Sequence, residues 1–256
     1  MQKMSLKQYS QFSDARTRAS VDLARHIPLT SPKRIMDIGC GLGNSTDVLK
    51  KRYPNAHIIG VDNSREVLNK AREYYPDLTF CYLDVAKDLV SIKQKYDLLF
   101  SNTAIQWIPN HAQVLQNMIN IVNDGGVVAI QTPMQAGHPM HAIIQNVCQR
   151  EPWKEKLEGI RTFYNLKEEE YFDLLSELSS DFTYWYTTYC HRMPNYESIM
   201  ELLKGIGMFP YLEKLNEEES KRFESEIFEE VKKSFPMQKN GEILFHFPRL
   251  FLIAVK

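Results

Sequence analysis

The stretch that decides the fold is Arg34-Ile-Met-Asp-Ile-Gly-Cys-Gly-Leu-Gly-Asn-Ser-Thr46. Its first part, residues 34–38, is an apolar run that predicts a buried strand. Its last part opens a stretch with helical spacing, residues 45–53. Three glycines lie between the two, and glycine allows the backbone to turn sharply. Strand, glycine turn and helix in this order are typical of a layered α/β protein that holds a ligand where its first strand ends.

The same alternation continues to about residue 131. Further β-rich runs lie at residues 57–61, 78–83, 96–101 and 127–131, and helical patterns lie at 64–74 and 111–122. Two more β-like runs follow at 182–189 and 243–255, and Pro248 is expected to interrupt or bend the second. Apolar strands separated by helices predict an α/β fold with a doubly wound, mainly parallel seven-stranded sheet, whose last two strands pair as a hairpin.

The length of 256 residues fits one large domain, and we expect residues 1–256 to form a single one. An N-terminal helical segment, about residues 1–25, is expected to close over the site. The regular alternation stops after Pro133. The stretches at about 133–180 and 195–235 are therefore predicted to form a helical cap.

The composition is that of an ordinary globular protein, with 43% hydrophobic and 25% charged residues. A net charge of -1 provides no field for a polyanion, so nucleic acid is not an expected partner. No apolar run is long enough to span a membrane, and the N-terminal stretch lacks the apolar centre of a secretory signal. We expect a cytoplasmic monomer. The four cysteines are widely spaced and form no metal-binding pair, so no metal is expected.

The glycine turn differs from two common nucleotide-binding turns. A dinucleotide fingerprint, G-x-G-x-x-G, requires glycine where this chain has Asn44, and no Gly-Lys-Ser/Thr follows as in a P-loop. Asp62 ends the second predicted strand about 20 residues later, where a carboxylate can bind both hydroxyls of a ribose. Asp84 ends the third strand, where its carboxylate can accept a hydrogen bond from an adenine amino group. A ligand that contains a ribose with two free hydroxyls is predicted.

This arrangement resembles the class I S-adenosylmethionine-dependent methyltransferases. The resemblance implies that S-adenosylmethionine is the cofactor and S-adenosylhomocysteine the product. Asp37 would help to hold the amino group of the cofactor, and Asn102 would lie between its sulfonium and the substrate. The cofactor-binding residues that the resemblance implies are Asp37, Gly39, Gly41, Gly43, Asp62, Asn63, Asp84, Val85, Asn102 and Trp107.

Within that superfamily the chain is most similar to trans-aconitate methyltransferases. The matching segments lie at both ends and in the predicted cap: residues 9–18, 39–46, 102–111, 185–194 and 240–251. Three residues depart from the family pattern, namely Ala19, Leu42 and Phe209. Phe209 stands where the family often has arginine, which leaves the acidity of the acceptor open.

The resemblance implies methyl transfer to a carboxylate of a small carboxylic acid, with trans-aconitate as the expected acceptor. A carboxylate is ionised at neutral pH, so the transfer requires no general base. No catalytic residue is assigned with certainty. Arginines suit the binding of the other carboxylates. The candidate substrate-orienting residues are Tyr9, Arg16, Arg18, Tyr189, His191 and Arg249.

Several alternatives remain open at this point. The acceptor can be a malonyl group on an acyl carrier protein, as in biotin synthesis, or another small molecule. The fold can also serve a nucleotide-dependent oxidoreductase or a nucleoside-binding module without activity. Trp107 can form a wall of the cofactor site or part of the core, and Asp84 can be an ordinary turn residue.

Overall fold

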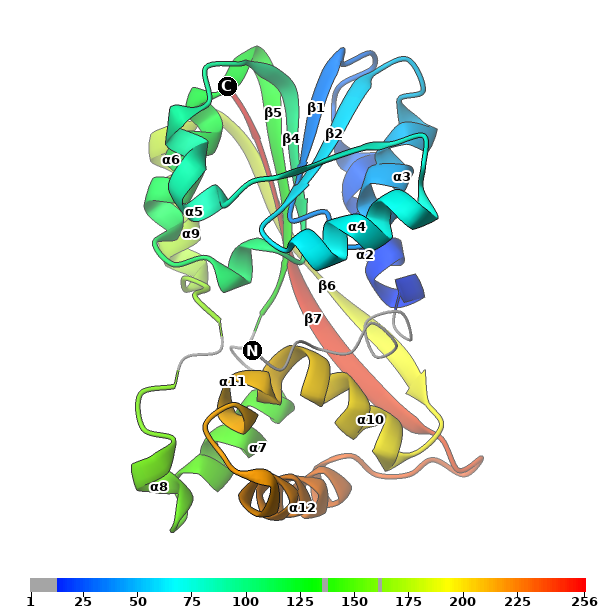
Figure 1. Cartoon of the computed structure of the whole chain (residues 1–256), viewed down its shortest axis with the longest axis vertical. Coiled ribbons are helices and arrows are strands. Elements are labelled where there is room, and N and C mark those ends of the chain that lie inside the picture. The colour runs from blue at the N-terminus through cyan, green and yellow to red at the C-terminus, as the bar shows by residue number, and fades with distance from the viewer. Residues whose placement is uncertain (1–12, 135–137, 161–162) are drawn as a thin grey trace. The chain divides into compact units, whose positions relative to one another are not determined.

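The computed structural model describes residues 13–134, 138–160 and 163–256, and its strands form one seven-stranded sheet (Figure 1). The strands are β1 (Arg34–Ile38), β2 (His57–Asp62), β3 (Thr79–Tyr82), β4 (Tyr96–Asn102), β5 (Val122–Pro133), β6 (Asp181–Met193) and β7 (Ile243–Val255). Their order across the sheet is β3-β2-β1-β4-β5-β7-β6. The seven strands and the adjacent final pair confirm the predicted fold class.

The direction of the strands creates a binding edge. Strands β1 to β5 run parallel to one another, and β7 runs antiparallel to β5. The chain leaves β1 for β2 on one side and later returns to β4 on the other. Open α/β sheets bind ligands at the carboxyl ends of the strands where the order reverses. That point lies between β1 and β4.

The chain divides into two compact units. The sheet unit comprises Asp14–Pro133, Tyr164–Thr187 and Arg249–Lys256, and the second unit comprises Met134–Phe163 and Thr188–Pro248 among the described residues. The sequence predicts cap segments at about 133–180 and 195–235, whereas residues 164–187 group with the sheet. They do so because α9 (Glu168–Leu178) packs on the sheet through Leu175.

Helices cover both faces of the sheet unit (Figure 1). On one face, α6 (His111–Asn120) and α9 bring Leu115 and Leu175 against Ile130 of β5. On the other, α3 (Asn44–Arg52) follows the glycine turn, and α4 (Arg65–Tyr74) begins at Ser64, whose hydroxyl accepts the N–H of Val67 as predicted for an N-cap. The remaining helices of this unit are α2 (Ser13–His26), α5 (Val85–Asp88), η1 (Leu89–Ser91) and η2 (Ile105–Trp107).

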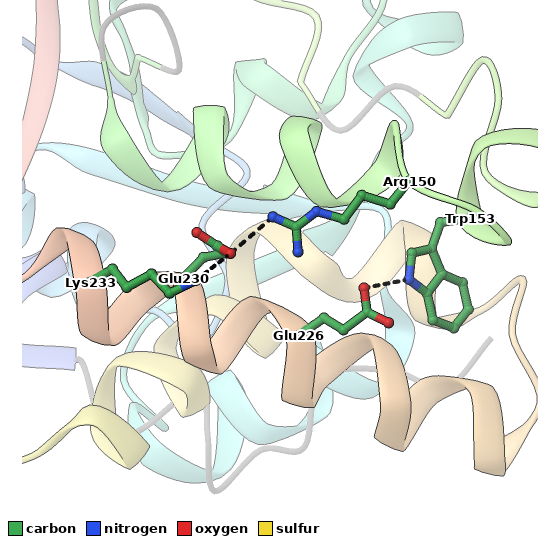
Figure 2. A network of polar contacts seen from close by, with 5 residues as sticks. All are labelled: Arg150, Trp153, Glu226, Glu230 and Lys233. Atoms are coloured by element: carbon green, nitrogen blue, oxygen red, sulfur yellow. Dashed lines mark hydrogen bonds and ion pairs between the residues drawn. The ribbon is translucent and has the colours of Figure 1, made fainter.

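The second unit has its own apolar core. Its helices are α7 (Pro139–Cys148), α8 (Trp153–Lys156), α10 (Tyr196–Leu203), η3 (Lys204–Met208), α11 (Phe209–Leu212) and α12 (Glu217–Ser234). The buried side of α12, with Phe223, Ile227 and Val231, packs into this core. Figure 2 shows the polar contacts beside it, in which Glu226 accepts from the Trp153 indole at 3.0 Å and Glu230 pairs with Arg150 at 2.9 Å. These contacts tie α12 to the segment of α7 and α8.

Strand β5 is longer than predicted, whereas β7 has the predicted bounds but is not interrupted at Pro248. Strand β5 starts at Val122 instead of residue 127, because Val122 pairs with Tyr96 across an irregularity in the β4 ladder. Strand β7 continues through Pro248, so the predicted interruption is wrong. Proline lacks an N–H, but the carbonyl oxygen of Pro248 still accepts from the N–H of Met134 at 3.2 Å. In the described residues, no helix is long and apolar enough to cross a membrane.

Candidate active site

The glycine turn lies at the carboxyl end of β1. Gly39, Gly41 and Gly43 have φ angles of 68°, 55° and 92°, in the region that favours glycine. A Cβ added to Gly39 would lie 2.1 Å from the Cβ of Ala104, and one added to Gly43 would lie 2.8 Å from the ring of Phe80. Glycine is therefore required at both positions by the packing of the protein itself.

Replacing Gly39 with alanine is expected to lower the melting temperature by roughly 5–15 °C and to abolish cofactor binding. A left-handed alanine costs about 1–2 kcal/mol, and the clash with Ala104 adds about 1–3 kcal/mol. Gly125→Ala is the matched control, since Gly125 has a φ of 75° and nothing within 4 Å of an added Cβ. It should show the backbone cost alone. Equal melting temperatures for the two variants, by differential scanning fluorimetry, would contradict the packing argument.

Four backbone amides of the turn donate hydrogen bonds within the protein. The N–H groups of Gly39 and Cys40 donate to the carbonyl oxygen of Val61, at 2.8 and 3.0 Å. The N–H of Gly41 donates to Asp62 at 3.1 Å, and that of Gly43 to the carbonyl of Cys40 at 3.0 Å. Turns that bind phosphate offer such amides to the anion. Because these amides already donate within the protein, the turn favours a ligand without phosphate, which agrees with the cofactor that the resemblance implies.

Asp37 lies below the turn and is fully buried. Its Oδ2 accepts hydrogen bonds from the hydroxyls of Ser45 and Thr46, both at 2.6 Å, in the first turn of α3. Its Oδ1 is buried with no hydrogen-bond partner in the described part of the chain. Burial raises the pKa of the Asp37 carboxyl to about 6, although the two hydroxyl bonds act to lower it. One oxygen is thus held in place while the other is left for a donor from a ligand.

Asp62 connects the end of β2 to the glycine turn. Its two oxygens accept from the backbone N–H groups of Gly41 at 3.1 Å and Ser64 at 2.9 Å. Burial raises the pKa of the carboxyl, partly opposed by these backbone bonds. Asn63 follows it and is exposed. The carboxylate is therefore fixed at the edge of the sheet beside the turn.

Asp84 follows β3 and caps a short helix. Its Oδ1 accepts from the N–H of Ala86 at 3.2 Å, and its Oδ2 pairs with Lys87 at 2.9 Å. Val85 is buried directly behind it. The turn role that the sequence leaves open for Asp84 is thus present, and binding of an adenine amino group by the same carboxylate stays a prediction.

The end of β4 leads into the turn η2. Asn102 ends the strand, and Trp107 is 41% exposed, so Trp107 is not a core residue. Buried His111 fixes this turn from below, because its Nε2 lies 2.8 Å from the carbonyl oxygen of Ile105 and its Nδ1 lies 2.6 Å from the hydroxyl of Tyr171. The carbonyl needs a donor, so Nε2 carries the proton and Nδ1 accepts from the tyrosine.

A buried arginine lies farther along the same edge. Arg249 is 4% exposed, and its Nη1 donates to Thr103 Oγ1 at 2.8 Å and to Gln131 Oε1 at 3.0 Å. In the ladders, Asp37 faces Phe100, Asn102 faces Gln131, and Arg249 faces Pro133. Facing residues, and residues two apart in one strand, share a sheet face. Asp37, Asn102, Gln131 and Arg249 therefore lie on one face.

The other predicted substrate residues are distributed differently. Arg18 is an exposed residue of α2. Tyr189 is buried and stacks on half-buried His191 with ring centroids 6.5 Å apart, within the second unit. Tyr9 and the side chain of Arg16 lie outside the described residues. Among the substrate candidates described in the sheet unit, Arg249 is the one that hydrogen-bonds at the end of β4, through Thr103.

Four contributors to the site have no role in the sequence prediction: Ser45, Thr46, Thr103 and Gln131. Ser45 and Thr46 lie 8 and 9 positions after Asp37 and open the helix that follows the turn. That spacing is a usable signal, because the first turn of such a helix faces the end of the strand before it. Thr103 and Gln131 lack a comparable signal.

The site fits S-adenosylmethionine, which carries an ammonium and a sulfonium but no phosphate. Two carboxylates with raised pKa values, buried Asp37 and half-buried Asp62, lie beside the turn and would favour a cation. Asp37 leaves one oxygen for a donor. Asp37 would hold the ammonium and Asp62 the ribose, and the glycine turn would lie against the methionine portion.

Comparisons with known proteins agree with this geometry. A family model described as "Methyltransferase domain" matches residues 29–192. A protein of Rhodopseudomonas palustris (strain BisB18), named trans-aconitate 2-methyltransferase, is 37% identical over 252 residues and covers 98% of each chain. The YcgJ protein of Bacillus subtilis has a similar structure, with a TM-score of 0.60, 12% identity and coverage of 93% of this chain and 98% of that one.

A second solved structure is phosphoethanolamine N-methyltransferase 2 of Haemonchus contortus in complex with S-adenosyl-L-methionine. Its TM-score is 0.52 at 17% identity, over 93% of this chain and 52% of that one. At these identities the two structures support the fold alone, whereas the curated relative and the family model support common descent. This chain therefore belongs to the class I S-adenosylmethionine-dependent methyltransferases, in the same family as the curated protein from Rhodopseudomonas.

Proposed function

We propose that the protein transfers the methyl group of S-adenosylmethionine to a carboxylate oxygen of a small polycarboxylic acid, with trans-aconitate as the acceptor. The observation that carries this proposal is the buried guanidinium of Arg249, on the same sheet face as Asp37. The printed name of the relative from Rhodopseudomonas supports the choice of acid.

The chain needs no general base for this reaction. A carboxylate acceptor is already ionised at neutral pH. When bound, S-adenosylmethionine supplies an electrophilic methyl group on a sulfonium. The protein has to orient the attacking oxygen, exclude water and bind the remaining carboxylates. A methyl ester and S-adenosylhomocysteine are the products.

Arg249 is suited to bind a carboxylate that does not react. Its acceptors in the network, the Thr103 hydroxyl and the Gln131 carboxamide, are both neutral. Both hydrogen bonds orient the guanidinium. A planar guanidinium offers two parallel N–H groups to a carboxylate, and such charge-assisted bonds are strong where water is excluded.

The remaining candidates complete the proposal. Tyr189 and His191 would donate hydrogen bonds to the acceptor, and Tyr9, Arg16 and Arg18 would close over it from the N-terminal segment. A truncation that removes residues 1–18 should then lose activity. A cytoplasmic location and a monomeric state stay predictions. The malonyl acceptor on a carrier protein is not favoured, since the curated relative is named for an aconitate.

The direct test is release of S-adenosylhomocysteine by the purified protein. The acceptors are trans-aconitate, cis-aconitate, itaconate and a malonyl thioester, with S-adenosylmethionine in excess. Turnover confined to the aconitates is expected. Turnover on the malonyl thioester alone would replace the proposed acceptor with the carrier-bound one.

A further inference from the structure

Gln131 is a buried polar residue near the carboxyl end of β5. Its side chain is fully buried, and the ladders place it opposite Asn102 of β4 and Phe251 of β7. It therefore shares the sheet face of Asp37 and Arg249. The donors and acceptors of a buried polar side chain normally have hydrogen-bond partners, and an exception calls for an explanation.

The orientation of its carboxamide is fixed by Arg249. A guanidinium has donors and no acceptor, so the Gln131 atom that lies 3.0 Å from Arg249 Nη1 must be the oxygen. The same Oε1 accepts from the hydroxyl of Thr103 at 2.8 Å. The amide cannot be flipped without placing two N–H groups against the guanidinium.

The other end of the carboxamide is left with no partner. Gln131 Nε2 is buried and makes no hydrogen bond within the residues that the structure describes. A buried donor in this state costs about 1–3 kcal/mol. An acceptor from a bound ligand would remove that cost, so the amide marks a place where a ligand oxygen is expected.

Thr103 supports the same arrangement through its hydrogen bonds, although its backbone is strained. Its φ is 59°, which is unusual for a β-branched residue and costs about 1–3 kcal/mol. Its N–H donates to the carbonyl oxygen of Gln131 at 2.9 Å, and its hydroxyl binds both Gln131 and Arg249. The hydrogen bonds of Thr103 thus hold the amide and the guanidinium together in spite of the strain.

We propose that Gln131 determines specificity by binding the acceptor directly: its Nε2 donates to a carboxylate oxygen of a di- or tricarboxylic acid beside Arg249. A carboxylate accepts through both oxygens, so one can face the guanidinium and the other the amide. This inference rests on the proposed function for the class of acceptor. It adds a neutral hydrogen-bond donor beside the charged guanidinium of Arg249.

The test uses two substitutions with different chemistry. Gln131→Glu keeps an acceptor toward Arg249 and Thr103 but puts an oxygen where Nε2 was, facing the ligand carboxylate. Gln131→Met keeps the volume and removes both polar atoms. The probe is tricarballylate, a saturated tricarboxylate, titrated calorimetrically into the protein with S-adenosylhomocysteine present. The matched control is Gln116→Glu, which places the same new charge on the exposed surface of α6.

We expect the dissociation constant of tricarballylate to rise about 100-fold or more in Gln131→Glu and about 10-fold in Gln131→Met. The affinity for S-adenosylhomocysteine should change less than about threefold, and Gln116→Glu should match the wild type. In kinetics the variants should raise KM for the acid far more than they lower kcat. A role confined to folding would instead affect cofactor and acid alike.

The outcomes separate this inference from the proposed function. If the wild type methylates trans-aconitate and the Gln131 variants bind tricarballylate as the wild type does, the inference is wrong and the proposed function stands. If the wild type binds tricarballylate, loses it in both variants and methylates none of the acids, the carboxylate site stands and the proposed reaction fails. Absence of binding in the wild type overturns the inference outright.

Discussion

Replacing Asp37 with asparagine is expected to weaken the binding of S-adenosylmethionine about 100-fold at pH 7.5 and, at the same time, to raise the melting temperature of the ligand-free protein. The proposed role of Asp37 is to bind the ammonium of the cofactor, and removing one partner of such a buried charged contact costs about 2–5 kcal/mol, or roughly 30-fold to several thousand-fold. The gain follows from the pKa of about 6 that burial gives the carboxyl. The same charge that serves the ligand destabilises the empty site.

The sign of the stability change can be derived from the pKa. The folded value of about 6 lies above the ordinary value of 3.8, so the folded protein holds this proton more tightly than the unfolded chain. The stability from this group is complete below about pH 4 and is lost as the pH rises through about 6. At neutral pH the loss is roughly 3 kcal/mol, since each pKa unit corresponds to about 1.4 kcal/mol. Asparagine can still accept from Ser45 and Thr46, so a rise of roughly 5–10 °C is expected.

The matched control is Asp97→Asn, at the opposite end of β4. Asp97 accepts from Asn123 and from the backbone N–H groups of Lys33 and Arg34. These bonds hold its pKa below the ordinary value despite partial burial. The same substitution should therefore lower the melting temperature there and leave cofactor affinity unchanged.

Calorimetric titration between pH 5 and 8 gives a further readout. The wild type should bind the cofactor more weakly as the pH falls through about 6, because binding then requires loss of a proton from Asp37. The Asp37→Asn variant should lose this dependence. Unchanged affinity in that variant at pH 7.5 would remove Asp37 from the cofactor site.

The parts of the fold that the sequence predicts well depend on neighbouring residues. Each strand from β1 to β4 is a short apolar run, and α4 begins at a serine that caps it. The glycine turn is predicted because strand, turn and helix follow one another directly. The prediction for Asp62 depends on an equally local signal, a carboxylate at the end of a strand about 20 residues farther on.

The parts that were not predictable depend on long-range geometry. Gln131 and Arg249 are 118 positions apart, and only the antiparallel pairing of β5 with β7 brings them together. The positive φ of Thr103 could not be predicted, because a β-branched residue rarely adopts that conformation and nothing in the sequence marks the exception. From the sequence, Gly39 is predicted only to allow a sharp turn, whereas the structure adds a second reason, the close approach of Ala104.

Replacing Arg249 with methionine is expected to lower kcat/KM for trans-aconitate by about 10²–10³-fold, mainly through KM. Loss of one partner from a buried, charge-assisted contact costs about 2–5 kcal/mol, and each 1.4 kcal/mol is tenfold. The proposed place of the cofactor is the turn after β1, whereas Arg249 hydrogen-bonds at the ends of β4 and β5. The affinity for S-adenosylhomocysteine should therefore change less than about threefold.

Arg249→Lys separates charge from geometry. Lysine keeps the positive charge but offers a single ammonium in place of the planar fork, so it cannot hold Thr103, Gln131 and a bidentate carboxylate in one plane. We expect an intermediate loss, about 10-fold smaller than that of Arg249→Met. Arg150→Met is the control, because Arg150 makes a surface pair with Glu230, and pairs of that kind contribute at most about 1 kcal/mol. If lysine and methionine are equally poor, the fork and not the charge recognises the acid; if KM is unchanged in both, the acceptor carboxylate is bound elsewhere and the proposed role of Arg249 is wrong.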